Sequence, residues 1–188
     1  CGNGNFADLS IFSFHPVKHI ACGEGGMITT NNENLYTSYL ALYNWLVQHI
    51  DEYKYVMHSD LRDVIIQKDP FKFIEKHPDK ELFIVAEGMS LNDSECNLKW
   101  AKRYNELLYG YKMNYDNSKV INSGTMAGKT HSFMQLCVNV MMNIDRPHKY
   151  YVYDQAVLNY LYPVYMNNKF VLTSEPDKSD FVITGEGV

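Results

Sequence analysis

The sequence predicts an α/β domain in which a mixed β-sheet is flanked by helices. Segments rich in β-branched and aromatic residues alternate with segments whose apolar residues recur every three or four positions. The chain has 188 residues, of which 46% are hydrophobic, and this is enough to bury a core. Because strands and helices alternate, we expect ligand chemistry at the ends of the strands.

The boundaries of the expected elements follow from these patterns. We expect strands at residues 8–14, 27–30, 53–58, 82–87 and 119–122, and further strands near Phe170 and Phe181. We expect helices at residues 33–49, 92–108, 131–143 and 154–162, the second of them broken near its start. Residues 124–130 are expected to form a strand-to-helix turn. Their Gly-Lys-Thr sequence has one residue too few after Gly124 for a phosphate-binding P-loop.

The composition excludes several classes of protein. A net charge of -5 argues against nucleic-acid partners, because binding to a phosphate backbone needs a basic face. The four cysteines are widely spaced, which predicts reduced thiols in a cytoplasmic protein rather than a zinc cluster or a disulfide framework. No apolar run reaches the length of a membrane span.

A glycine-rich segment around Lys18 is the first candidate site. It reads SFHPVKHIACGEGG from Ser13 to Gly26, and it places one lysine among a hydroxyl, imidazoles and glycines. A lysine acts as a nucleophile only when its neutral form is populated, and burial among polar neighbours favours that form. The alternative interpretation is a surface lysine in a glycine-rich hairpin.

From about Asn5 to Leu42 this segment resembles the DegT/DnrJ/EryC1/StrS family of pyridoxal-phosphate-dependent aminotransferases, which act on nucleotide-linked keto-sugars. The resemblance implies that Lys18 links covalently to the cofactor and then shuttles a proton. It also implies that Ser13 contacts the cofactor phosphate. The remaining parts of such a site, an acid on the pyridine nitrogen and an aromatic stacked on the ring, have no identifiable source in this segment.

The second candidate site is the acidic cluster Asp60-Leu61-Arg62-Asp63, which follows an expected strand. Carboxylates at a strand end suit a divalent ion bound to a diphosphate, because hard cations prefer oxygen ligands. The alternative interpretation is a solvated turn that contains an Asp–Arg pair.

From about Tyr43 onward the chain resembles a GT-A type glycosyltransferase, which would be incomplete at its amino terminus. The resemblance rests on the segments HSDLRDVIIQKDPF, FIVAEG, VINSGTMAG and DQAVLNY, in this order. It implies that Asp60 and Asp63 bind Mn²⁺ or Mg²⁺ and that Asp154 is catalytic. It further implies that a sugar and an acceptor are bound by Asn122, Ser123, Gly124 and Gln155. The two aspartates stand three apart, which departs from the common Asp-x-Asp spacing.

The two resemblances together predict an aminotransferase-like segment at residues 1–42 and a glycosyltransferase-like domain at 43–188, or one merged domain. The leading hypothesis is a glycosyltransferase that acts on a nucleotide-activated sugar in polysaccharide biosynthesis. The first alternative is a fragment of a nucleotide-sugar aminotransferase that uses pyridoxal phosphate. The second is a folded protein without catalytic activity. The chain could be a fusion, a fragment or a chimera, and its oligomeric state stays open.

Overall fold

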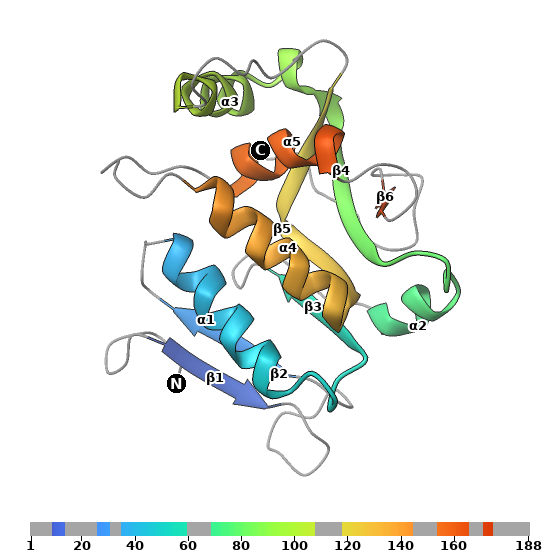
Figure 1. Cartoon of the computed structure of the whole chain (residues 1–188). Coiled ribbons are helices and arrows are strands. Elements are labelled where there is room, and N and C mark those ends of the chain that lie inside the picture. Colours follow the sequence, from blue (N-terminus) through green and yellow to red (C-terminus); the bar gives the residue numbers. More distant parts are fainter. Residues whose placement is uncertain are drawn as a thin grey trace.

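The structure is a computed structural model that describes residues 9–13, 26–30, 35–59, 69–107, 118–144, 154–165 and 171–174. Two strands, β1 (Leu9–Ser13) and β2 (Gly26–Thr30), form an antiparallel pair near the amino terminus (Figure 1). Helix α1 (Leu35–Gln48) follows them and lies beside α4 (Thr130–Asn143).

A four-stranded sheet lies at the centre of the molecule, and its strand order is β3-β5-β4-β6. Strands β3 (Tyr55–Ser59), β5 (Lys119–Lys129) and β4 (Leu82–Ser90) pair antiparallel, whereas β6 (Val171–Ser174) runs parallel to β4. The remaining elements are α2 (Pro70–Glu75), a short 3₁₀ helix at Leu91–Asp93, α3 (Glu95–Leu107) and α5 (Asp154–Tyr165). The sheet is therefore mixed, as predicted.

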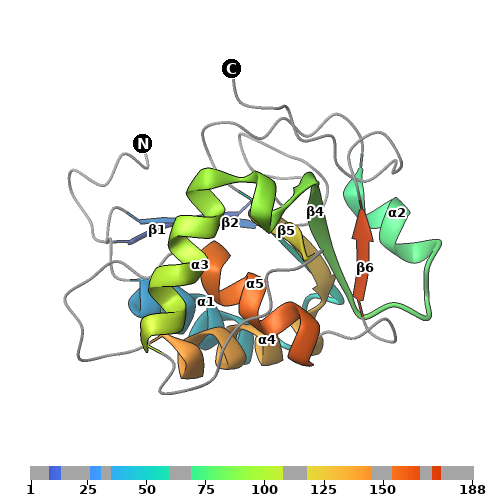
Figure 2. The same ribbon diagram turned by 90° about the horizontal axis from the view of Figure 1, so that it is seen from above.

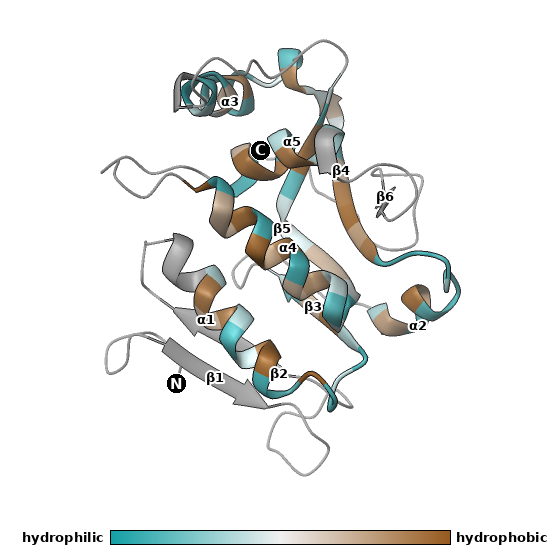
Figure 3. Cartoon of the chain, viewed as in Figure 1, coloured by the Kyte–Doolittle hydropathy of each residue, from teal (hydrophilic) through white to brown (hydrophobic). Residues whose placement is uncertain are grey.

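The helices divide between the two faces of the sheet. Helices α1, α4 and α5 lie together on one side, and α2 lies apart from them, beyond β6 in the view from above (Figure 2). The central part of β4 is hydrophobic, as are stretches of α4 and α5 (Figure 3). Along β4, Leu82, Ile84 and Ala86 belong to the large core with the three helices, whereas Phe83 packs in a smaller cluster with Ile74 of α2. This alternation is the period-two pattern of a strand covered on both faces.

The large core joins parts of the chain that the sequence assigns to different segments. Tyr39 and Leu46 of α1 are buried with Phe133 of α4 and with Leu158 and Leu161 of α5. Strand β3 also enters the central sheet through its pairing with β5. Residues on both sides of position 42 therefore share one core.

Local chemistry explains where several elements begin and end. Asp69 caps α2 by accepting a hydrogen bond from the Phe71 amide, and Pro70 occupies the first turn, where a missing N–H costs nothing. The expected break in the 92–108 helix is confirmed, because Leu91–Asp93 forms a separate 3₁₀ turn before α3 begins at Glu95. The predicted strands near residues 8–14, 27–30, 53–58 and 82–87 are also present, with small shifts of their ends. The strand expected near Phe181 lies outside the described residues.

The prediction for residues 124–130 is wrong. Strand β5 does not end at Asn122 but continues through Gly124 and Gly128 to Lys129, and α4 begins directly at Thr130. The physical reason is that this half of β5 is the inner strand of the sheet, paired on one side with β3 and on the other with β4. Position 128 needs a glycine, because a Cβ atom there would clash with the Glu81 carbonyl oxygen at 2.4 Å.

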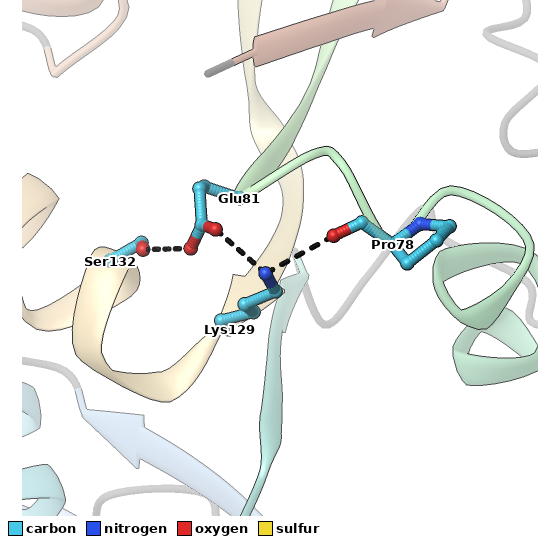
Figure 4. A network of polar contacts seen from close by, with 4 residues as sticks. All are labelled: Pro78, Glu81, Lys129 and Ser132. Atoms are coloured by element: carbon cyan, nitrogen blue, oxygen red, sulfur yellow. Dashed lines mark hydrogen bonds and ion pairs between the residues drawn. The ribbon is translucent and has the colours of Figure 1, made fainter. Parts of the chain in front are cut away.

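A polar corner, formed by Glu81, Lys129 and Ser132, closes the sheet where β4 begins and β5 ends (Figure 4). The Lys129 ammonium donates to Glu81 Oε1 at 2.6 Å, and the Ser132 hydroxyl donates to Glu81 Oε2 at 2.7 Å. The hydrogen bond from Lys129, together with that from Ser132, holds the pKa of the Glu81 carboxyl below its ordinary value, against the opposing effect of burial. This corner therefore fastens α4 to the sheet with a compensated charge.

Candidate functional site

The structure brings one group of predicted site residues together and leaves the other group outside the described residues. Asn122, Ser123 and Gly124 lie within β5, and Asp154 and Gln155 are the first two residues of α5. Lys18, Asp60 and Asp63 are outside the described residues. Ser13 is the last residue of β1, where its Cα partner is Gly26 of β2. Two antiparallel strands therefore flank the segment that contains Lys18.

Gln155 is the centre of a polar network between α5, β5 and α3. Its side-chain oxygen accepts from the backbone amide and from the hydroxyl of Ser123, both at 3.3 Å. Its side-chain nitrogen donates to Asn97 Oδ1 at 2.7 Å and to Glu87 Oε1 at 3.1 Å. Asn97 in turn donates to the Ser94 hydroxyl. Because both ends of the Gln155 amide are engaged, its orientation is fixed.

Glu87 lies at the second of two irregularities in the ladder between β4 and β5. The register shifts between Ile84 and Val85, and it shifts again after the Ala86–Ile121 pair, beyond which pairing resumes at Ser90 and Lys119. Such irregularities re-aim side chains and are frequent next to functional sites. Glu87 Oε1 accepts from Asn122 Nδ2 at 3.1 Å as well as from Gln155, while Asn122 Oδ1 accepts from the Gly124 amide at 2.7 Å. The carboxylate is thus held by neutral amides.

Asn159, one turn after Gln155 on the same face of α5, anchors the helix to β5. It is 4% exposed. Its side chain accepts from the Ile121 amide at 2.8 Å and donates to the Ile121 carbonyl oxygen at 3.2 Å. A hollow of about 200 Å³ lies beside it, lined by Ala86, Ser118, Lys119, Ile121, Asn159, Tyr162 and Pro163. Asn159 thereby satisfies both the N–H and the carbonyl oxygen of Ile121, whose Cα partner in β4 is Ala86.

Three participants in this arrangement were not assigned a role from the sequence: Glu87, Asn97 and Asn159. The spacing of Gln155 and Asn159 places both amides on one helix face, and this was the signal available for Asn159. Glu87 stands in the FIVAEG segment, but nothing in the sequence indicates the interruption of the ladder that directs it toward Gln155.

The other reactive groups in the described part of the chain have limited chemistry. Asp154, the first residue of α5, accepts at Oδ1 from the Gln155 amide and so satisfies one of the N–H groups that the first turn leaves without a helical partner. Burial raises the pKa of the Cys137 thiol to about 12, which keeps it protonated, whereas Cys96 is exposed. Over the described ranges, no three His, Cys, Asp or Glu side chains come together as a metal site. None of the helices described has the length and apolarity needed to cross a bilayer.

The amino-terminal part of the chain is similar to known proteins. Residues 2–60 match the DegT/DnrJ/EryC1/StrS aminotransferase family. A 32-residue stretch, 17% of this chain, is 62% identical to UDP-4-amino-4,6-dideoxy-N-acetyl-beta-L-altrosamine transaminase of Campylobacter jejuni serotype O:23/36 (strain 81-176). The same values relate it to the transaminase of that name from serotype O:2 (strain NCTC 11168). The matched stretch spans only 8% of the length of these relatives.

These matches overturn the leading functional prediction. Both the family and the curated relatives are aminotransferases, so the glycosyltransferase hypothesis is wrong and its aminotransferase alternative is supported. The family match also extends through residue 60, into the first segment that carried the glycosyltransferase resemblance. The GT-A form of the α/β fold and the Mn²⁺ or Mg²⁺ ion at Asp60 and Asp63 lose their support with it.

Proposed function

We propose that this chain carries the lysine-bearing segment of a pyridoxal-phosphate-dependent aminotransferase that acts on a nucleotide-activated sugar. The observation that carries the proposal is the family match over residues 2–60, which contains Lys18. The antiparallel pairing of β1 and β2 agrees with it, because the Ser13–Gly26 pair brings the two ends of the Lys18 segment together. The substrate class rests on the curated relatives, which are named as transaminases of a UDP-linked amino sugar.

The donor groups of this segment fit the cofactor in two respects. Lys18 supplies an amine for the cofactor aldehyde, and Ser13 supplies a hydroxyl for its phosphate. When bound, pyridoxal phosphate supplies the electron sink that makes a proton beside the transferred nitrogen removable. In this proposal Lys18, in its neutral form, takes that proton and returns it at the neighbouring carbon.

Trapping the cofactor on the protein tests the proposal. The chain is incubated with pyridoxal phosphate, treated with borohydride and digested, and the modified lysines are located by mass spectrometry. We expect selective modification of Lys18, and its loss in Lys18→Ala. Lys72→Ala is the matched control, because its side chain is 78% exposed and pairs only loosely with Asp69. Modification spread evenly over the surface lysines would instead support the glycine-rich hairpin interpretation and overturn the proposal.

A second measurement addresses the substrate class. A UDP-linked amino sugar should compete with Lys18 for the cofactor and reduce trapping, whereas UDP alone should not. If neither compound alters trapping at Lys18, the nucleotide-sugar part of the proposal fails while the cofactor part stands.

A further inference from the structure

Among the residues that the structure describes, Glu87 lacks the cationic partner that three other carboxylates have. Glu81 pairs with Lys129, Asp69 lies 4.0 Å from Lys72, and Asp79 lies 3.3 Å from Lys80. No lysine or arginine in the described part of the chain forms an ion pair with Glu87, although its side chain is only partly exposed. A carboxylate that is partly removed from water keeps an unbalanced charge unless a cation meets it.

The groups around Glu87 are oriented before any ligand arrives. Gln155 is fixed by Asn97 and Ser123, and Asn122 is fixed by the Gly124 amide. Both amides therefore present N–H groups to the same oxygen, Oε1. Within the described residues, no group donates to the second oxygen, Oε2. The carboxylate is held in one orientation with one oxygen available.

Glu87 is half-buried, and its neighbours are polar or exposed. The next residues along β4, Gly88 and Met89, are exposed, and the interrupted ladder leaves this stretch of β4 without a regular partner in β5. Asn122 retains a second side-chain N–H, and Ser123 carries a hydroxyl that can also accept a hydrogen bond. A side-chain amide and a hydroxyl are common hydrogen-bond partners for the neutral hydroxyl groups of a ligand.

We propose that Glu87, Asn122 and Ser123 form a binding site for a small molecule that carries a protonated amine beside hydroxyl groups, of the amino-sugar class. The ammonium group meets the free oxygen of Glu87, and the adjacent hydroxyls meet the amide of Asn122 and the hydroxyl of Ser123. A cation is favoured over a neutral hydroxyl because charge-assisted hydrogen bonds are about twice as strong as neutral ones. This inference does not depend on Lys18 or on the cofactor.

Three related sugars separate the charge from the shape of the ligand. Glucosamine carries the ammonium group, glucose replaces it with a hydroxyl, and N-acetylglucosamine replaces it with a neutral amide. We expect saturable binding of glucosamine by calorimetry, and binding of the other two sugars that is weaker by about tenfold or more, the loss expected when a charged hydrogen bond is removed. Equal binding of the three sugars, or no binding of glucosamine, would overturn the proposal.

Two variants locate the site. Glu87→Gln keeps the shape of the side chain and removes its charge, so it should abolish the preference for glucosamine. Glu95→Gln, at an exposed position of α3, removes the same charge elsewhere and should leave binding unchanged. In the unmodified protein, glucosamine should shift the amide resonances of Ser123 and Gly124, which gives a readout that needs no variant. Preference for glucosamine that survives in Glu87→Gln, or shifts confined to other regions, would place the ligand elsewhere and contradict the proposal.

Discussion

Strand β4 has two carboxylates near its ends, and they are held in opposite ways. Glu81 precedes the strand and accepts from the ammonium of Lys129 and the hydroxyl of Ser132, at a corner closed by the start of α4. Glu87 lies where the ladder with β5 is interrupted, and among the described residues only the neutral amides of Asn122 and Gln155 donate hydrogen bonds to it. The first arrangement balances a charge and fastens two elements together. The second fixes a charge in place without balancing it.

The difference is the basis for the ligand site that we propose at Glu87. The Glu81 carboxylate already pairs with a cation and contributes to folding. The Glu87 carboxylate is held in place without a cation and can therefore bind a positively charged group of a ligand. The packing around the two ends differs in the same sense. Gly128 brings β5 against the Glu81 carbonyl oxygen, while at the other end a buried amide, Asn159, bonds the backbone of Ile121 and a hollow lies beside it. The following variants test this contrast.

Gly128→Ala should have the largest effect, because it forces a side chain into the closed end. The added Cβ would lie 2.4 Å from the Glu81 carbonyl oxygen and 2.8 Å from Leu82 Cδ2, so the backbone of β4 must move. We expect a loss of about 3 kcal/mol in the free energy of unfolding, measured by urea denaturation. Gly88→Ala, at an exposed position of the same sheet, is the control and should change the free energy by less than about 1 kcal/mol. A tolerated Gly128→Ala would mean that the closed end is looser than its contacts indicate.

Asn159→Ala should be next in size and should act at the open end. The variant leaves the Ile121 N–H and carbonyl oxygen without their side-chain partner in a buried position. We expect a cost of about 2 kcal/mol, the typical penalty for orphaning buried polar groups. Hydrogen exchange of the Ile121 amide should accelerate more than that of the Val120 amide. Asn92→Ala, at an exposed residue, is the matched control. Unchanged exchange at Ile121 would show that Asn159 does not anchor the helix.

Glu81→Gln should cost about 1 kcal/mol at neutral pH, since both partners of the ion pair are about one-third exposed and solvent screens them. The pKa of Glu81 is lowered in the folded state, so its contribution is present above the unfolded pKa, near 4.5, and is lost as the pH falls through the folded pKa. The difference between the parent protein and Glu81→Gln should therefore shrink below about pH 4.5. A difference that stays constant down to acid pH would assign the effect to packing rather than to charge.

The sequence predicted local structure better than it predicted the sites. Strand and helix positions followed from periodicity, and the break before α3 was visible as a weak helix start at Asn92. The path of β5 was not predictable, because Gly124 and Gly128 indicate a turn unless their partners in β3 and β4 are known. Asn122 and Gln155 were named as site residues through the glycosyltransferase resemblance, and their role stays a prediction. Glu87 was not named, because its position depends on a register shift between distant strands.

The division of the chain into two segments could not be predicted from the sequence in terms of packing either. The predicted boundary at residue 42 rests on where one resemblance ends, and it stays a prediction. The packing does not divide at that position, because Tyr39 and Leu46 lie in one core with α4 and α5. A helix contributes its apolar face to whichever surface covers it, whatever the ancestry of the segment.

Glu87→Gln should have the smallest effect on stability, and it tests the contrast between Glu81 and Glu87 most directly. Glutamine keeps an oxygen that can accept from Asn122 and Gln155, so the network persists with neutral hydrogen bonds in place of charge-assisted ones. The loss is offset because a partly buried charge without a cationic partner no longer needs to be desolvated. We expect a change in the free energy of unfolding of less than about 0.5 kcal/mol, against about 1 kcal/mol for Glu81→Gln.

The pair of variants, measured in the same buffer at neutral pH, thus separates a carboxylate that stabilises the fold from one that does not. A loss at Glu87 as large as that at Glu81 would reveal a cationic partner for Glu87 in the folded protein and would remove the basis for a ligand at its free oxygen.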